Sequence, residues 1–428
     1  MKILIKKYLI IILCIAFCFL SACSSRNVEK AFVLYGTPTY SLSPIIHIQT
    51  ILGGSNDDYV FEVLYCDNYI YVIGETNSND GSFTSSSDGH KLFLAVLNNK
   101  GQFLKCLTFG KSNTKNKYVK AKVINTYIYV LSDCSLETQS VVLYKIDLNN
   151  NSVHNTVLGS LLVDENALDL IEWKDSIFVI GQAYDNTSSC KSLFITRLDY
   201  SLKQKHYERI IRAADLTYIG TESSSNSLKV WINAVAISYS YPAMIDISKD
   251  NYVYNNFESQ LLSYRLLNIA SINDNVLLVL SNEKLNNSAA YVFYCSNSFE
   301  KINNLDIENI THAKIAPIKD NALVSFYGRT SLYYLINKDV KLPQNELSKK
   351  NATCEKSLSI STGTLIMTKN NNCYELLYIN KLKTKIMNLG NYDNINSFCV
   401  FKDFLIIASN EKNDIKISFS KIMPYYFI

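Results

Sequence analysis

Residues 60–76, VFEVLYCDNYIYVIGET, carry the complete pattern of a β-hairpin. Apolar and polar residues alternate up to a polar turn at Asp67 and Asn68, and a second apolar run over 69–73 ends at Gly74. Alternation, a short Asp-Asn turn and a run of β-branched and aromatic residues are typical of two antiparallel strands. The stretch therefore predicts a hairpin whose turn lies at 67–68.

The same pattern recurs seven more times along the chain, at an average interval of about 48 residues. A fixed period of this length is the signature of a repeat architecture. The later turns are expected at Asn125, Asp175, near Asn226, Asp274, Asp320, Gly363 and Asp403.

Many of these hairpins are followed by a third strand, such as KLFLAVLN from Lys91, and several by a fourth. Four antiparallel strands in 40 to 50 residues form the blade of a β-propeller. We therefore predict an all-β fold with a single β-propeller of about eight four-stranded blades. Seven blades is the alternative, because the fourth unit is poorly formed. Two stacked β-sandwiches fit less well, since they do not explain one steady period.

The stretch before the first hairpin, PIIHIQTIL at residues 44–52, is also strand-like. It could supply the outer strand of the last blade, so that the ring is closed by overlap and has no free edge. We therefore expect the propeller domain to cover 44–428. We also expect the closing strand to bury its isoleucines, which are Ile45, Ile46, Ile48 and Ile51.

The first 22 residues have the parts of a secretory leader. Three lysines precede an uncharged apolar core over residues 8–20, and two small residues then precede Cys23. The core is shorter than the ~20 residues that span a bilayer.

The sequence Leu20-Ser21-Ala22-Cys23 resembles the lipobox of bacterial lipoproteins. The resemblance implies cleavage before Cys23 and acylation of its thiol and of its new amino group. Residues 1–22 would then be a lipoprotein signal peptide and 23–43 a lipidated tether. The expected location is the cell membrane or outer membrane, lipid-anchored and extracytoplasmic. The alternative is an ordinary signal peptide or an uncleaved anchor, with Cys23 incidental.

The first unit also resembles bacterial propeller repeats that carry a GGS-x-DD-Y turn, a later G-E-T-x-S and a glycine in the final turn. The matching residues are 53–59, 74–78 and Gly101. The resemblance covers about 60 residues and implies the propeller fold. Later units keep the apolar pattern and lose the glycines, of which the chain has 14.

Motifs for catalysis or for a cofactor are missing from the sequence: it has no phosphate-binding glycine loop, no G-x-S-x-G and no HExxH. The five histidines are scattered, and no calcium loop is present, so we expect neither a metal nor a cofactor. We expect most of the cysteines of the mature domain to be buried thiols. They are Cys66, Cys106, Cys134, Cys190, Cys295, Cys354, Cys373 and Cys399.

The net charge of the mature chain gives no reason to expect a nucleic-acid partner. Without the three leader lysines the net charge of +4 falls to +1, which gives no strong attraction to nucleic acid. The run KSNTKNKYVKAK at 111–122 has five lysines and is expected to be a solvated loop between blades, or else a contact with anionic polymer or lipid.

These observations favour a membrane-anchored lipoprotein whose propeller is a non-enzymatic binding or scaffold module of the cell envelope. Its partners would be the membrane, through Cys23, and an envelope protein or polymer. The alternative is an envelope enzyme that acts on glycans or peptides at the central channel. Such an enzyme would need carboxylates or a histidine that converge in one pocket.

Overall fold

The computed structural model describes residues 46–421 with internal gaps. The gaps are 85–89, 111–114, 136–138, 159–163, 186–189, 211–214, 237, 249–250, 273–274, 296, 319–320, 328–330, 337–340, 344–352, 361–362, 371–372, 380–383, 393 and 402–403. The leader 1–22, Cys23, the tether 23–43 and residues 44–45 therefore lie outside the described residues, as do Asp274, Asp320 and Asp403.

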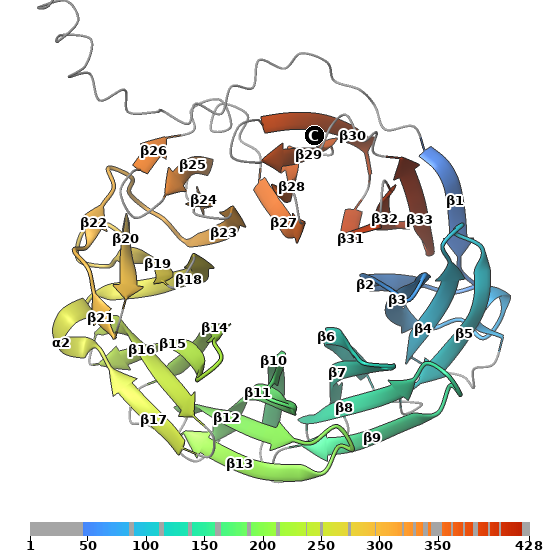
Figure 1. Cartoon of the computed structure of the whole chain (residues 1–428), viewed down its shortest axis with the longest axis horizontal. Coiled ribbons are helices and arrows are strands. Elements are labelled where there is room, and N and C mark those ends of the chain that lie inside the picture. The colour runs from blue at the N-terminus through green and yellow to red at the C-terminus, as the bar shows by residue number, and fades with distance from the viewer. Residues whose placement is uncertain are drawn as a thin grey trace, which may run out of the picture.

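The described strands form eight antiparallel sheets arranged around a central opening (Figure 1). We call each sheet a blade and number the blades from the first hairpin. This confirms the predicted all-β propeller, with one sheet for each of the eight predicted repeats.

The strands of the first four blades follow one another in sequence. Blade 1 contains β2 (Asp58–Cys66), β3 (Tyr69–Thr76), β4 (Lys91–Asn98) and β5 (Phe103–Phe109). Blade 2 contains β6 (Lys115–Ile124), β7 (Tyr127–Ser135), β8 (Gln139–Asp147) and β9 (Val153–Leu158). Blade 3 contains β10 (Asp164–Trp173), β11 (Ser176–Asp185), β12 (Cys190–Leu198) and β13 (Gln204–Ile210). Blade 4 contains β14 (Leu216–Ser223), β15 (Leu228–Ala236), β16 (Tyr239–Ser248) and β17 (Asn251–Asn256).

The remaining blades continue in the same order, with a fifth short strand in blade 5. Blade 5 contains β18 (Tyr264–Ile272), β19 (Asn275–Asn282), β20 (Ser288–Cys295), β21 (Ser298–Phe299) and β22 (Asn303–Asn304). Blade 6 contains β23 (His312–Ile318), β24 (Asn321–Tyr327), β25 (Ser331–Ile336) and β26 (Lys341–Pro343). Blade 7 contains β27 (Thr353–Ile360), β28 (Gly363–Asn370), β29 (Cys373–Ile379) and β30 (Thr384–Asn391). Blade 8 contains β31 (Asn394–Phe401), β32 (Phe404–Glu411), β33 (Asp414–Lys421) and β1 (Ile46–Leu52). The short helices η1 (Gly81–Phe83) and α2 (Glu258–Leu261) lie in connections.

The hydrophobic core is a series of layers between neighbouring blades. In one layer, Ile73 and Leu94 of blade 1 pack with Ile128 and Val130 of blade 2. Because each sheet is covered on both faces, its middle strands are continuous apolar runs, and β4 is buried from Lys91 to Leu97. Each fully buried aliphatic side chain stabilises the fold by ~1.5–3 kcal/mol.

The ring is closed as predicted, because β1 pairs antiparallel with β33 as the outermost strand of blade 8 (Figure 1). Leu52 is fully buried in the layer shared by blades 8 and 1. The predicted burial of the isoleucines is wrong where it can be assessed, since Ile48 and Ile51 are exposed. Side chains alternate along a strand, so Ile51 lies on the face opposite the buried Leu52 and points to solvent. Ile48 lies on the same face as Leu52, next to Gly101, and 38% of it remains exposed.

The hairpin turns agree with the sequence prediction in the first units. Asp67 and Asn68 have φ of 48° and 65°, and Lys174 and Asp175 have φ of 47° and 53°. Two successive residues with positive φ form the type I′ turn that matches strand twist. The fourth hairpin joins Ser223 to Leu228 through four residues and belongs to a complete blade. Gly363 is the first residue of β28 and not part of the turn.

Among the described residues, no helix has both the length and the apolar character that a membrane span requires.

Candidate functional site

The residues of the first-unit motif meet around the carboxylate of Asp58, which is fully buried. This carboxylate accepts hydrogen bonds from Gly54 N (2.9 Å), Thr76 Oγ1 (2.6 Å) and Ser78 Oγ (3.1 Å). Burial raises the pKa of Asp58, although these bonds lower it in part. The motif therefore ties the start of β2 to the end of β3.

The same motif also joins blade 1 to blade 8. Asp58 N donates to the carbonyl oxygen of Asn413 over 3.1 Å. A Cβ atom at Gly53 would lie 2.0 Å from Oδ1 of Asp414, so a larger residue there would require the Asp414 side chain to move. The turn at 53–59 thus holds the seam of the ring, and its resemblance to propeller repeats concerns the fold.

The innermost strands, which surround the central opening, share a second repeated feature. In seven of the eight blades the pairing of the first two described strands has a register shift, as between Val60 and Glu62 in blade 1. A bulge of this kind bends the strand and changes the direction of a side chain. Gly74 lies opposite Val60, and a Cβ there would lie 2.0 Å from the carbonyl oxygen of Tyr59.

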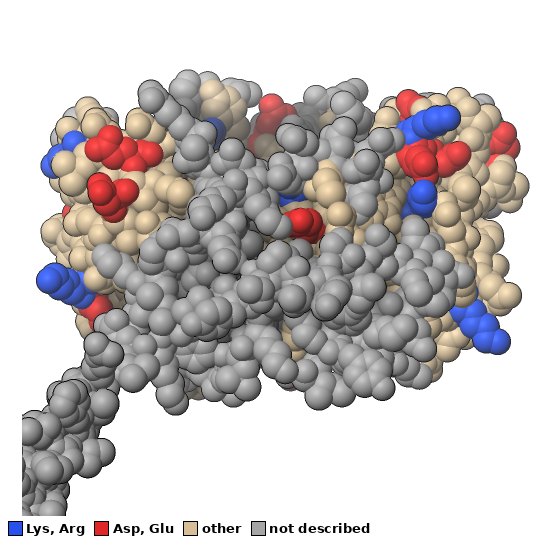
Figure 2. All heavy atoms as spheres, turned by 90° about the horizontal axis from the view of Figure 1, so that it is seen from above, with Lys and Arg blue, Asp and Glu red and all other residues tan. Residues whose placement is uncertain are grey.

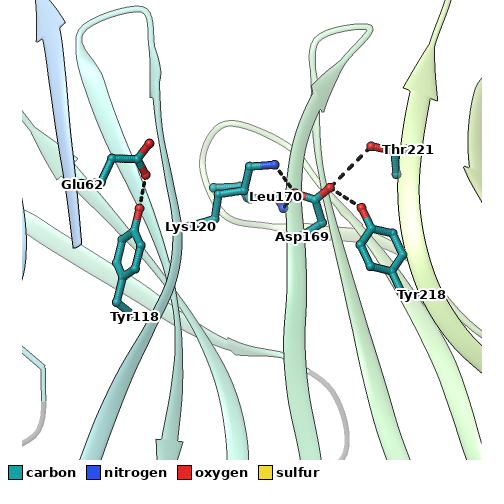
Figure 3. A network of polar contacts seen from close by, with 7 residues as sticks. All are labelled: Glu62, Tyr118, Lys120, Asp169, Leu170, Tyr218 and Thr221. Carbon is teal, nitrogen blue, oxygen red and sulfur yellow. Dashed lines mark hydrogen bonds and ion pairs between the residues drawn. The ribbon is translucent and has the colours of Figure 1, made fainter. Parts of the chain in front are cut away.

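Polar side chains next to these bulges connect neighbouring blades. Lys120 of blade 2 forms an ion pair with Asp169 of blade 3, and Asp169 also accepts hydrogen bonds from Tyr218 and Thr221 of blade 4 (Figure 3). The Tyr118 hydroxyl donates to the carboxylate of Glu62 in blade 1. Burial, and then Asp169, raises the pKa of Tyr218, so this hydroxyl keeps the proton that it donates.

The contacts continue on the other side of the ring. Nζ of Lys356 donates to Oγ of Ser397 over 2.8 Å, which joins blade 7 to blade 8. Nζ of Lys314 lies 3.8 Å from Oε2 of Glu355 and joins blade 6 to blade 7. Nδ2 of Asn396 donates to the carbonyl oxygen of Val60 over 2.6 Å and returns to blade 1.

A third set of polar residues lies on the second strand of the blades, at one position of the hairpin. Each member bonds to the main chain of the first strand in the next blade, and the set consists of Glu75, Asp133, Gln182, Asn233 and Asn410. Asn233 makes two such bonds, to the amide and the carbonyl of Leu266. We call these residues blade staples. Three staples are amides and two are carboxylic acids, and each offers the acceptor or donor that a main-chain group of the next blade needs.

The staple Asp133 predicts a pH dependence of stability. Burial raises its pKa to about 6, while the hydrogen bond from Ala167 N and the charge of Lys117 lower it. The folded pKa of Asp133 exceeds the unfolded value of about 3.9, so the protonated carboxyl group stabilises the fold relative to the ionised one. This contribution of Asp133 to the free energy of unfolding is complete below pH 4 and is lost as the pH rises through 6. Asp133→Asn keeps an oxygen acceptor for Ala167 and cannot ionise. We expect the variant to be more stable than wild type by about 1–2 kcal/mol at pH 8 and equal to it at pH 4.

Chemical denaturation at pH 4, 6 and 8 measures this difference. Asn233→Asp is the matched control, because it places a carboxyl group at the same position of blade 4 and should introduce the pH dependence that Asp133→Asn removes. An unchanged pH profile in Asp133→Asn would show that this carboxyl group does not titrate in the folded chain near pH 6.

In the described part of the chain, the histidines and cysteines do not come together in one site. His206 stacks on Tyr252 at 4.6 Å and His312 on Tyr327 at 4.5 Å between ring centroids. Within those residues no group of three or more His, Cys, Asp and Glu could hold a metal ion. Of the six described cysteines, Cys134 is buried and the other five are half-buried, so the prediction that most of the cysteines are buried is wrong for these residues. Burial raises the pKa of Cys106 and of Cys399 to about 12, which keeps both thiols protonated.

The lysine run at 111–122 was expected to be a loop between blades, and this is wrong for its described part. Residues 115–122 lie in β6, the innermost strand of blade 2. Lys120 pairs with Asp169, and Nζ of Lys122 lies 3.9 Å from Oε2 of Glu172. Two lysines of the run thus pair with acids of the facing strand β10.

Comparisons with known proteins add the fold alone. No model of a protein family matches the chain, and no curated protein sequence matches it. Among solved structures, it is similar to the β-propeller domain of the Trilobed protease from Pyrococcus furiosus, which has an open velcro topology (TM-score 0.48, 9% identity, 79% of this chain and 99% of that one). It is also similar to the WD40 domain of SCAP from fission yeast (TM-score 0.47, 9% identity, 88% and 98%). A third similar structure is the acylaminoacyl peptidase of Pyrococcus horikoshii (TM-score 0.47, 10% identity, 82% and 57%), of which the match spans little more than half.

Proposed function

We propose that this chain is a bacterial envelope lipoprotein whose propeller is a non-enzymatic binding or scaffold module. The acylated Cys23 would hold it on the cell membrane or outer membrane, on an extracytoplasmic face. The proposal rests on the lipobox-like sequence 20–23, on the tether that follows it and on the use that the ring makes of its polar side chains.

The main support for a binding role is that two carboxylates of the innermost strands are engaged in hydrogen bonds and an ion pair between blades. Glu62 and Asp169 both accept hydrogen bonds from a tyrosine of the next blade, and Asp169 also accepts the ammonium group of Lys120. A carboxylate engaged in this way is held for the integrity of the ring. General acid–base catalysis would require it to be within reach of a substrate proton.

The place of β1 agrees with the role of a tethered platform. Its first described residue, Ile46, lies on the outermost strand of blade 8, so the preceding chain joins the ring at its rim (Figure 1). An attachment at the rim leaves the loops on the faces of the ring to make contacts. Confinement near a membrane raises the effective concentration of other envelope components, so modest contacts suffice.

The surface charge fits a neutral envelope partner better than a polyanion. Figure 2 shows the ring from its outer side, where acidic and basic side chains both occur among uncharged residues on the described surface. A protein that binds nucleic acid by its backbone would show a basic stripe instead.

The test is a capture experiment with the full chain, cross-linked in its native membrane and purified through a C-terminal tag. We expect reproducible recovery of an envelope protein or polymer, and no turnover of glycosides, peptides or esters. Glu62→Gln and Asp169→Asn are assayed in parallel. Turnover by wild type that falls at least tenfold in either variant would favour the enzyme over the scaffold.

A further inference from the structure

Blades 1 and 2 enclose a pocket of about 350 Å³ between them, on the side of the ring that carries the β2–β3 turn. We call it the tyrosine pocket. Aromatic, aliphatic and polar side chains line it, among them Tyr69, Tyr71, Val96, Lys105, Leu148 and Asn149. A volume of this size is at the lower end of small-molecule sites and accommodates one long side chain or a molecule of similar size.

The wall of the pocket belongs to a feature that occurs twice in the chain. Tyr69 and Tyr71 open β3, with ring centroids 6.4 Å apart and ring planes at 52°. Tyr127 and Tyr129 open β7 in the same place, with centroids 6.4 Å apart and planes at 59°. Both pairs follow a two-residue turn, so the two blades present the same aromatic surface to the next blade.

In the second occurrence, the chain covers this surface with its own cation. Nζ of Lys145 lies 3.8 Å from the ring centroid of Tyr127 and donates to the carbonyl oxygen of Tyr200 over 2.6 Å. The Tyr129 hydroxyl donates to the same carbonyl over 2.9 Å. The arrangement is a cation over an aromatic face, with a main-chain oxygen as its hydrogen-bond partner.

Blade 3 repeats the use of a cation at this position. Lys145 lies opposite Tyr129, and Arg197 lies opposite Phe178 at the corresponding place. The guanidinium carbon of Arg197 is 5.9 Å from the ring centroid of Phe178, and its Nε donates to Ser176.

Blade 1 has the tyrosines without the cation. The residue opposite Tyr71 is Val96, which is too short and too apolar to replace Lys145. Tyr200, which follows Asp199 in blade 3, corresponds to Leu148, which follows Asp147 in blade 2. The side chain next to the tyrosine pocket is therefore the smaller leucine. As a result 42% of Tyr69 is exposed, whereas Tyr127 is half-buried beneath Lys145.

We propose that the tyrosine pocket binds the ammonium group of a lysine side chain on a partner protein. The incoming ammonium would take the place that Lys145 has in the next blade, over Tyr69 and towards the carbonyl of Leu148. This inference goes beyond the proposed function, because it names the chemical group recognised and holds whether or not Cys23 is acylated.

The charges around the pocket favour a cation. Asp147 lines the pocket, and Asp67 lies in the turn immediately before Tyr69. The one basic lining residue, Lys105, donates through Nζ to Oδ1 of Asn151 and is held against blade 2. Among the described lining residues Asp147 is the one acid and Lys105 the one base. Because the ammonium group of Lys105 is bound to Asn151, the carboxylate of Asp147 can attract a second cation.

The test is a ligand-observed NMR titration of the full chain in detergent with Nα-acetyl-lysine methylamide. Nα-acetyl-norleucine methylamide, which has a similar chain and no ammonium group, is the control ligand. We expect saturable binding of the lysine compound, at least about fivefold tighter than that of norleucine. N-acetylglucosamine is titrated as well. Equal affinity for norleucine, preferential binding of the sugar or no saturable binding of the lysine compound would overturn the proposal.

Two variants locate the binding. Val96→Lys supplies the cation that blade 2 already carries at this position, so it should fill the pocket and abolish binding with the fold retained. Lys145→Val makes blade 2 resemble blade 1 and should add a second site, doubling the number of ligands bound. If Val96→Lys, shown to be folded by its thermal unfolding, binds the lysine compound as wild type does, the tyrosine pocket is not the site.

Discussion

Deletion of residues 46–52 is expected to lower the free energy of unfolding by about 4–8 kcal/mol, a large part of the 5–15 kcal/mol of a typical domain. The strand pairs with β33 from Ser420 to Ile415, and each hydrogen bond of such a ladder contributes about 0.5–1.5 kcal/mol. Leu52, which is fully buried, adds about 1.5–3 kcal/mol. The deletion also leaves β33 as an unpaired edge, which exposes a template for aggregation.

Chemical denaturation of the full chain and of the deletion variant measures the loss. Two point variants separate burial from pairing within the same strand. Leu52→Ala should cost about 2–5 kcal/mol, because it leaves a cavity between blades 8 and 1. Ile51→Ser should cost less than about 0.5 kcal/mol, since 61% of Ile51 is exposed. An unchanged midpoint in the deletion variant, or equal losses in the two point variants, would contradict closure by this strand.

The architecture could be predicted because local signals repeat. Each hairpin combines alternating apolar and polar residues with a polar turn. Eight copies at a steady spacing can bury both faces of every sheet if the sheets stack around a common axis. The residues 67–68 and 174–175 even have the positive φ that the turn chemistry implies. Closure was predictable for a related reason: an unmatched strand at 44–52 and an incomplete last unit complement each other.

The contacts between blades could not be predicted, because they join residues about 45 positions apart through the geometry of the ring. The lysine run shows the difficulty: five cations without an acid look like a solvated loop, and only the facing strand β10 supplies Asp169 and Glu172. The expected burial of Ile51 is wrong because a strand at the rim has one covered face, and periodicity does not tell a rim strand from a middle one.

The blade staples can be recognised in the sequence. If the hairpins are aligned on their turns, one polar residue interrupts the apolar second strand at the same place, as Glu75, Asp133, Gln182 and Asn410 do. A buried polar position that recurs in this way needs a partner outside its own hairpin, because its strand neighbours are already paired. The first-unit motif was visible in the sequence, yet its role at the seam became clear only from the bonds of Asp58.

Replacement of Cys23 by alanine is expected to abolish fatty-acid labelling of the chain completely. The acyl group would be carried by the thiol of Cys23, and alanine has no atom that can accept it. The lipobox resemblance implies that cleavage depends on Cys23, so the variant should also keep residues 1–22 and migrate as the longer precursor. The measurement is metabolic labelling with a radioactive fatty acid, followed by electrophoresis of the immunoprecipitated chain.

The leader itself offers the matched control. Cys18→Ala removes a cysteine five residues earlier in the same chain, within the apolar core, and should leave both labelling and cleavage unchanged. One acyl chain gives only marginal membrane binding, whereas two or more hold a protein stably, so the labelled wild type should remain with membranes after a high-salt wash. Equal label in wild type and Cys23→Ala would place the acyl group elsewhere or make the leader an ordinary signal peptide. In either case Cys23 would not be the anchor that the proposed function requires.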